Sequence, residues 1–125
     1  MPSTLIALKR VYEPASADDG VRILVERLWP RGLTKAAAEI DHWAKDAAPT
    51  SDLRTWYGHR PVRWREFRSR YRAELNDNRS AVNTLRELCS EQRVTFIFAA
   101  KDVDRNGAVV LKEYFDAEKT KEKHT

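Results

Sequence analysis

VTFIFAA, residues 94–100, is the stretch that decides the fold. Side chains alternate between the two faces of a strand, and both faces of this run are apolar. Continuous apolarity over so few residues is typical of a strand that helices cover on either side. We therefore expect residues 94–100 to form the central strand of a sheet.

Two more strands are expected earlier in the chain. Thr4–Val11 alternates loosely between apolar and polar side chains and stops before Pro14. Val21–Leu28 has the same two-residue alternation and is ended by the Trp-Pro pair that follows it. Asp41–Ala47 is ambiguous, because its pattern suits a short strand as well as the continuation of a helix.

The spacing of apolar side chains predicts the helices. The clearest covers Pro61–Asn76, with a buried stripe made by Trp64, Phe67, Tyr71 and Leu75. Ser80–Glu91 is a second helix, and we expect the two to pack as a pair. The others are Leu33–Ile40 with Thr34 as N-cap, Asp52–Tyr57 between a Thr50 or Ser51 cap and Gly58, and a final helix from Asn106.

Strands mixed with helices, ending in a strand, loop and helix unit, indicate an α/β fold. We expect a small, at least partly parallel sheet with helices packed on it. A length of 125 residues suits a single domain. We assign that domain to residues 1–117 and expect the charged segment 118–125 to fray.

The composition restricts the cellular compartment and the kinds of site that we expect for this protein. Cys89 is the only cysteine, which excludes an intrachain disulfide and suits a reducing compartment. The chain lacks a secretory signal and any run of about 18 apolar residues, so we expect a cytoplasmic protein that does not enter a membrane. His42 and His59 fit no metal-binding spacing, so we predict no metal and no cofactor.

Arginines interrupt the apolar pattern around the second predicted strand, at Arg22, Arg27 and Arg31. A guanidinium cannot lose its charge, so it needs carboxylates, carbonyls or an anionic ligand. These side chains therefore indicate either a structural ion-pair network or an anion-binding pocket. The net charge of +4 permits attraction to phosphates or nucleic acid without requiring it.

In open α/β sheets, ligands bind beyond the carboxyl ends of the strands, near helix N-termini. Two loops qualify: one carries Arg27, Trp29 and Arg31, and the other carries Lys101, Asp102 and Asn106. If their strands are parallel neighbours, the basic groups converge on one pocket. The alternative is that Asp102 and Asp104 pair with Arg27 or Arg31 to hold the loops.

Some candidates have two interpretations. His59 follows Trp56-Tyr57-Gly58 and can act as an acid or base if its loop faces the basic pocket, or else is a surface residue. Trp29 and Trp56 either pack in the core or stack on a nucleobase. Asn106 caps the final helix, and no glycine-rich phosphate motif surrounds it.

Several motifs stand out along the chain: KRVYEP at 9–14, DDGVRILVERLWPRGL at 18–33, LRTWYGH at 53–59, and FAAKD with NGAVVLKE within 98–113. In this combination the chain resembles the YeaO-like branch of the bacterial domain-of-unknown-function family 488. The resemblance covers the chain up to about Ala117 and implies a cytosolic α/β domain without specifying an activity.

The resemblance also implies a departure. The resemblance implies that relatives in the wider family carry a Cys-His-Arg triplet at the start of the last helix. This chain has Asn106, Gly107 and Ala108 at those positions. Chemistry that depends on that thiol or imidazole is therefore absent here. Lys101 and Asp102 remain to bind or position a ligand, which favours a binding role or a different chemistry.

Three functional hypotheses follow. The first is a pocket for a small anionic, phosphate- or nucleotide-like ligand, formed by Arg22, Arg27, Trp29, Arg31, Lys101, Asp102 and Asn106. The second is an enzyme in which His59 and Asp102 act as acid and base on such a ligand, which requires both to face one cavity. The third is a nucleic-acid-binding or interaction module that uses the arginines of helix 61–76. The oligomeric state is not predicted.

Overall fold

Four parallel strands form one sheet in the order β1-β4-β2-β3. They are β1 (Ile6–Arg10), β2 (Val21–Leu24), β3 (His42–Trp43) and β4 (Val94–Phe98). The computed structural model describes residues 6–123. The predicted α/β class with an at least partly parallel sheet is confirmed, and every strand pair of the sheet is parallel.

β4 is an inner strand of the sheet, and every one of its residues is buried. Val94 is in register with Ile6 of β1 on one side and with Val21 of β2 on the other. Because β4 has a strand on each side and apolar cover on each face, all of its side chains except Thr95 are apolar. The central position predicted from residues 94–100 is confirmed.

The first strand ends at Arg10 instead of Val11, and the second is shorter than predicted. β1 is described from Ile6, and Thr4 and Leu5 of the predicted strand lie outside the described residues. β2 ends at Leu24 instead of Leu28, although the Val25 N–H still donates to the Ile97 carbonyl. The ladder stops there because the next amide after β4, that of Ala99, donates to the Glu26 carboxylate instead.

The segment after β2 forms a short helix, a short strand and a 3-10 turn, and the ambiguous residues 41–47 contain the strand and the turn. A short helix, α1 (Lys35–Ala38), is capped by the Thr34 hydroxyl, which accepts the Ala37 N–H at 3.0 Å. β3 then contributes a two-residue edge strand, and a 3-10 turn, η2 (Lys45–Ala47), follows it. The Thr34 cap is therefore confirmed, while the helix is shorter than Leu33–Ile40.

The remaining helices are α2 (Ser51–Tyr57), a 3-10 turn η3 (Pro61–Arg63), α3 (Trp64–Asp77), α4 (Arg79–Ser90) and α5 (Gly107–Lys123). The Thr50 hydroxyl accepts the Leu53 N–H and caps α2, which ends at Gly58 in the left-handed region with a φ of 54°. Thr50 and Gly58 therefore have the predicted roles.

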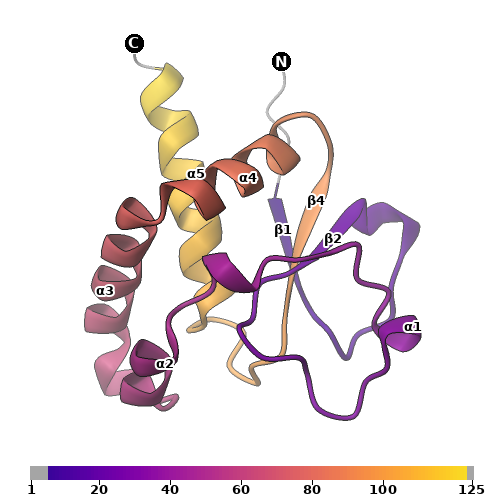
Figure 1. Ribbon diagram of the computed structural model, residues 1–125, viewed down its shortest axis with the longest axis horizontal. Helices are drawn as coiled ribbons and strands as arrows, with labels where there is room; N and C mark the ends of the chain where they lie inside the picture. The colour runs from indigo at the N-terminus through magenta and orange to yellow at the C-terminus, as the bar shows by residue number, and fades with distance from the viewer. Residues whose placement is uncertain (1–5, 124–125) are drawn as a thin grey trace.

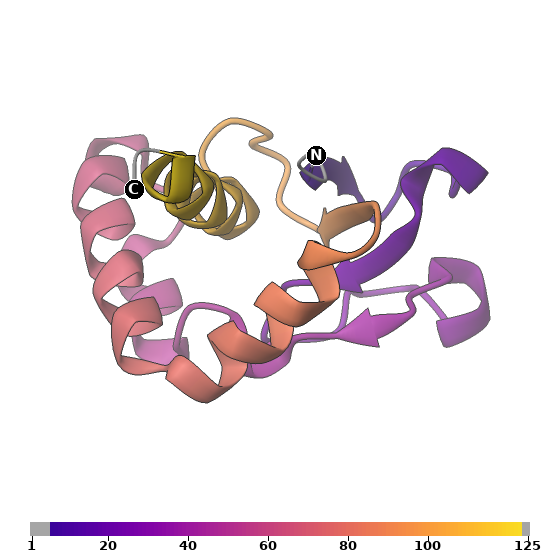
Figure 2. The same ribbon diagram turned by 90° about the horizontal axis from the view of Figure 1, so that it is seen from above.

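The two faces of the sheet are covered unequally. Ile23 and Phe96 face the large core, which α2 to α5 complete. Leu24 and Ile97 face a smaller core, covered by α1 and the loops around it. Figure 1 shows α3 and α5 on one side of the sheet and α1 on the other. Figure 2 shows the same separation from above.

One prediction about packing is wrong. We expected helices 61–76 and 80–91 to pack as a pair, but α3 lies mainly along α5. The chain turns sharply at Asn78, so α4 leaves α3 end to end and packs Val82, Leu85 and Cys89 into the large core. The spacing of apolar residues correctly indicated which faces are buried, but not which element covers each face.

The final helix extends beyond the domain boundary that we assigned at residue 117. α5 extends past Ala117 to Lys123, and Glu118 forms an ion pair with Arg86 of α4 at 2.7 Å. The fraying of 118–125 stays a prediction. Within residues 6–123 we find no helix whose length and hydropathy together suffice to cross a bilayer.

Candidate functional site

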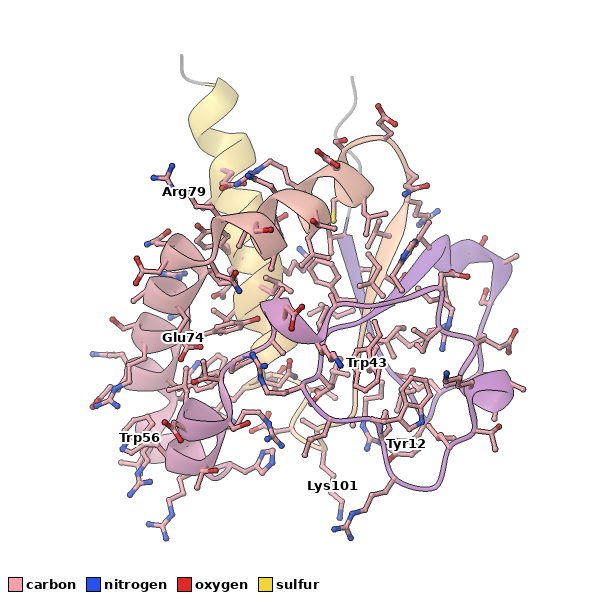
Figure 3. The ribbon with its side chains drawn as sticks, in the orientation of Figure 1. Tyr12, Trp43, Trp56, Glu74, Arg79 and Lys101 are labelled. Carbon is pink, nitrogen blue, oxygen red and sulfur yellow. The ribbon has the colours of Figure 1, made fainter. Side chains whose placement is uncertain are left out.

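A cavity of about 490 Å³ opens beyond the carboxyl ends of the strands. Its walls come from the segment after β2, the segment after β4 with the start of α5, and α2 with its following turn. Figure 3 shows Tyr12 and Lys101 at this end of the molecule, with Arg79 at the opposite end. The parallel sheet brings these segments together because all of its strands finish at the same edge.

Most of the predicted site residues lie in this cavity. It is lined by Arg27, Trp29, Arg31, His59, Lys101 and Asn106, together with Tyr12, Glu26, Arg54, Tyr57 and Gly107. The two loops that the sequence singled out therefore face each other across one space. Positive charge dominates the lining, since Glu26 is the only acidic residue among the described residues that form it.

The cations of the cavity are not neutralised by acidic partners. Among the described residues, no ion pair includes Arg27, Arg31, Arg54 or Lys101. The alternative in which Asp102 or Asp104 pairs with Arg27 or Arg31 is therefore wrong. Glu26 lies in the same cavity and interacts electrostatically with Arg54, but it forms no ion pair with any of these cations.

Arg27 also has a structural role. Its guanidinium donates to the carbonyls of Ala48 and Pro49, each at 3.0 Å, and so ties the segment after β2 to the segment before α2. Carbonyl oxygens satisfy its hydrogen bonds but leave its full positive charge in place. Arg27 therefore contributes positive electrostatic potential to the cavity. Arg31 is exposed and can contact a ligand directly.

Arg22 is not brought to the cavity. It is buried at the start of β2, where it donates to Asp19, to the Ala38 carbonyl and to the Glu39 carbonyl. β2 ends at Leu24, and Arg27 lies beyond that end of the strand. Arg22 thus belongs to a structural ion pair at the opposite end of the strand.

Asp102 organises its own loop and is not part of the cavity lining. Its Oδ1 accepts the backbone N–H groups of Asp104 and Arg105, and its Oδ2 lies 3.4 Å from the Arg105 guanidinium. These bonds, that of Asp104 first, lower the pKa of Asp102 against the opposing effect of desolvation. A carboxylate with a lowered pKa is a weak base, and this one is not among the residues that line the cavity with His59.

Asn106 and Gly107 begin α5 at the floor of the cavity. The Asn106 Oδ1 accepts the Val109 N–H at 3.0 Å, and its Nδ2 donates to the Asp102 carbonyl. A Cβ at Gly107 would lie 3.3 Å from the Cγ of Pro49. Capping and close packing therefore account for both residues locally, and they also direct the positive end of α5 toward the cations.

Comparison with known proteins assigns the family. The family model described as "Inactive DUF488-N3 subclade" matches residues 5–125. The chain belongs to this subclade. The predicted relation to the YeaO-like branch is confirmed, since the chain is 38% identical to the uncharacterized protein YeaO of Escherichia coli over 109 residues, 87% of this chain and 95% of that protein.

Mycobacterial relatives are closer in sequence. The uncharacterized proteins Rv3073c of Mycobacterium tuberculosis and Mb3100c of Mycobacterium bovis are each 44% identical over 108 residues, 86% of this chain and 91% of theirs. No solved structure matches the chain. The subclade is described as inactive, and Asn106, Gly107 and Ala108 place neither a thiol nor an imidazole at the start of α5.

Sequence reasoning missed Glu26, Arg54, Tyr12 and Tyr57 as lining residues. Glu26 could have been found, because it is the only acid between Val21 and Arg31, in an otherwise apolar and basic run. Arg54 and Tyr57 could not, since their position depends on how α2 folds back onto the strand ends. The Tyr57 hydroxyl donates to the Arg105 carbonyl at 3.1 Å and links α2 to the other wall.

Glu26 is partly buried at the strand end. Its Oε2 accepts the Ala99 N–H at 3.2 Å. Burial raises the pKa of Glu26, while the Ala99 N–H and the charges of Arg54 and His59 oppose that rise without cancelling it. The cavity thus combines several fixed positive charges with a single carboxylate, that of Glu26, which is the only one among the described lining residues and lies in a poorly hydrated position.

His59 lies in the left-handed region with a φ of 57°, directly after Gly58 in the same region. A side chain other than glycine is strained there, although histidine tolerates it better than most. Its ring centroid lies 6.2 Å from that of Tyr57, at the cavity wall. The strained backbone holds the imidazole at the site.

Trp29 is held firmly by its surroundings. Its indole Nε1 donates to the Leu33 carbonyl at 2.7 Å, and its ring contacts Trp43 edge to face at 5.4 Å between centroids. Trp29 therefore presents a fixed aromatic surface to the cavity. Trp56 does not line the cavity, and the guanidiniums of Arg63 and Arg70 lie over its ring.

Proposed function

We propose that this protein binds a small anionic ligand, phosphate- or nucleotide-like, in the cavity at the carboxyl ends of its strands. The observation that carries the proposal is the convergence of Arg27, Arg31, Arg54 and Lys101 on one concave space. None of them forms an ion pair with a carboxylate in the part of the chain described here. Such charge attracts anions and raises their local concentration.

The geometry suits an anion in particular. Guanidinium groups present planar, paired donors that match phosphate and carboxylate oxygens. The first turn of α5 adds the positive end of a 17-residue helix, whose Gly107 lines the cavity. A phosphate group beside Lys101 and Arg31 would therefore meet charge from two loops and from the helix.

The size and lining favour an organic anion over an inorganic one. A volume of about 490 Å³ falls within the range of roughly 300 to 1,000 Å³ found for small-molecule sites. Tyr12, Trp29 and Tyr57 contribute aromatic surface beside the cations, and the exposed Leu28 lies at the rim. A phosphate ester with a ring would use both kinds of lining.

The two alternative functions have less support. An acid and base pair of His59 and Asp102 requires a shared cavity, and Asp102 does not line the one that contains His59. The nucleic-acid alternative relies on the arginines of α3, but Arg68 and Arg72 pair with Glu113, and Arg70 pairs with Glu66. We therefore propose binding and assign no reaction.

Thermal unfolding with a panel of anions tests the proposal. Inorganic phosphate, sulfate and nucleoside monophosphates are added to the wild-type protein, and we expect at least one of them to raise Tm in proportion to its occupancy. Arg31→Ala and Lys101→Ala remove exposed cations of the cavity, so they should lose most of this rise.

The matched control is Arg65→Ala. Arg65 is an exposed arginine of α3 outside the cavity, so its removal changes the net charge equally. Its response to the anions should equal that of the wild type. A flat response of the wild type to every anion, or an equal loss in Arg65→Ala, would refute the proposed function.

A further inference from the structure

The cavity contains an element that a simple anion site would not need. Glu26 adds a carboxylate to a lining whose other charged members, Arg27, Arg31, Arg54 and Lys101, are positive. Like charges repel more strongly where water is scarce, so this carboxylate weakens the binding of a bare phosphate. Its presence requires another explanation.

The Glu26 carboxylate has hydrogen-bond acceptor positions that no described residue fills. Oε2 accepts the Ala99 N–H, and Oε1 has no hydrogen-bond partner among the described residues. A carboxylate has about four acceptor positions in total. The side chain therefore retains acceptor capacity at the cavity wall, with the anchored oxygen fixing its orientation.

The groups that face Glu26 come from every element around it. Arg54 of α2 and His59 of the following turn interact with it electrostatically, Arg27 is its chain neighbour, and Ala99 belongs to the segment after β4. Arg27 uses two of its nitrogens on backbone carbonyls. None of these groups is bonded to Oε1, so an N–H or O–H of a ligand can reach it.

We infer that Glu26 makes the cavity selective for anions that also carry an N–H or O–H donor, with the anionic group beside Arg31 and Lys101 and the donor at Glu26. Nucleoside monophosphates have this chemistry, since they join a phosphate to a ring with N–H groups and to sugar hydroxyls. Sulfate has no such donor, and the O–H of inorganic phosphate belongs to the anionic group itself, so neither ion has a separate donor part. This inference rests on the proposed function and names the ligand class of the same site.

Glu26→Gln tests the inference. Glutamine keeps the shape of the side chain and a carbonyl oxygen that can accept the Ala99 N–H, so the strand end stays braced. Affinities for inorganic phosphate, AMP and GMP are measured by titration calorimetry at pH 7 and constant ionic strength. Glu39→Gln is the control, because Glu39 is exposed, lies outside the cavity and changes the net charge equally.

The variant should have opposite effects on the two kinds of ligand. Removing the negative charge should strengthen inorganic phosphate binding about three- to tenfold. Replacing a charged acceptor by a neutral one should weaken the binding of at least one nucleotide about tenfold. Glu39→Gln should change both affinities by less than about twofold, because exposed charges outside the site are screened.

A second variant, Glu26→Asp, keeps the charge and shortens the reach to the ligand. It should leave phosphate binding close to the wild-type value and weaken nucleotide binding. If the wild type binds anions but Glu26→Gln shifts phosphate and nucleotide affinity in the same direction, or shifts neither, the selectivity is refuted and the anion site remains. If the wild type binds no anion, both proposals fail.

Discussion

Arg22 donates from its Nη1 to the Oδ2 of Asp19 across 2.7 Å, and both side chains are more than nine-tenths buried. Asp19 also accepts from the Lys9 Nζ at 2.8 Å and from the Ser16 N–H at 3.0 Å. The remaining Arg22 nitrogens donate to the carbonyls of Ala38 and Glu39. This network joins the 3-10 turn η1 (Ala17–Asp19) to α1 across the start of β2.

Breaking this pair from one side should destabilise the protein strongly. Asp19→Asn keeps the size of the side chain but leaves the Arg22 guanidinium buried without a counterion, which costs about 3–5 kcal/mol. Urea unfolding at pH 7 measures the loss. Asp18→Asn, an exposed neighbour in the same turn, is the control and should cost less than about 0.5 kcal/mol.

The same residue should produce a defined pH dependence. Burial opposes ionisation of Asp19, but bonds from Lys9, Ser16 and Arg22 outweigh it and lower its pKa. A lowered pKa stabilises the fold fully above the unfolded value of about 4, and this contribution is lost as the pH falls through the folded pKa. The penalty of Asp19→Asn should therefore shrink between pH 5 and pH 2. A penalty that is constant over this range would contradict the assigned ion pair.

Substitutions at Gly20 and Gly32 distinguish the cost of backbone strain from the cost of a steric clash. Both have positive φ, at 65° and 78°, but a Cβ at Gly20 would lie 2.3 Å from the Arg93 carbonyl oxygen, whereas nothing lies within 4 Å at Gly32. Gly32→Ala should cost about 1 kcal/mol through backbone strain alone. Gly20→Ala should cost more than about 3 kcal/mol or prevent folding, as chemical denaturation would show. Equal costs at the two positions would contradict the close approach at Gly20.

Thr50 links two helices that shape the cavity. Its hydroxyl caps α2 by accepting the Leu53 N–H and donates to Glu74 of α3 at 2.6 Å, while its N–H donates to the other Glu74 oxygen. Thr50→Ala should lower the free energy of unfolding by about 1–2 kcal/mol. Thr50→Ser should lose much less, because the hydroxyl is retained. Thermal and urea unfolding measure both; an equal loss in Ser and Ala would exclude the capping role.

Glycine substitutions at His59 and Glu39 test whether the strained backbone at His59 contributes to ligand binding. They are the non-glycine residues with positive φ among those described, at 57° and 50°. Each change to glycine should raise the free energy of unfolding by up to about 1 kcal/mol. His59→Gly should also weaken anion binding, because His59 lines the cavity, and Glu39→Gly should not. Unchanged binding in His59→Gly would remove the imidazole from the proposed site.

The features that could be predicted from sequence are those set by local chemistry. The apolar run of β4, the stripe of α3 and the caps at Thr34 and Thr50 each follow from neighbouring residues and appear where expected. The convergence of the loops after β2 and β4 also followed, but only on the condition that these strands are parallel neighbours, which the sheet confirms.

Other features depend on contacts between distant segments. The three arginines in and after the second strand look alike in sequence, yet Arg22 meets Asp19 at one end of the sheet while Arg31 lies at the cavity at the other. The packing of α3 along α5 and the approach of Arg54 to Glu26 depend in the same way on the whole chain.

The sequence by itself determined an α/β domain, its buried faces and a basic region after the second strand, because periodicity and side-chain type act within a few residues. The tertiary structure alone decided which charges meet. Strand order and the path of α2 bring together residues more than 70 positions apart, as Glu26 and Ala99 demonstrate. Whether a charged group is neutralised or left facing a cavity depends on those distant partners, and no local pattern encodes them.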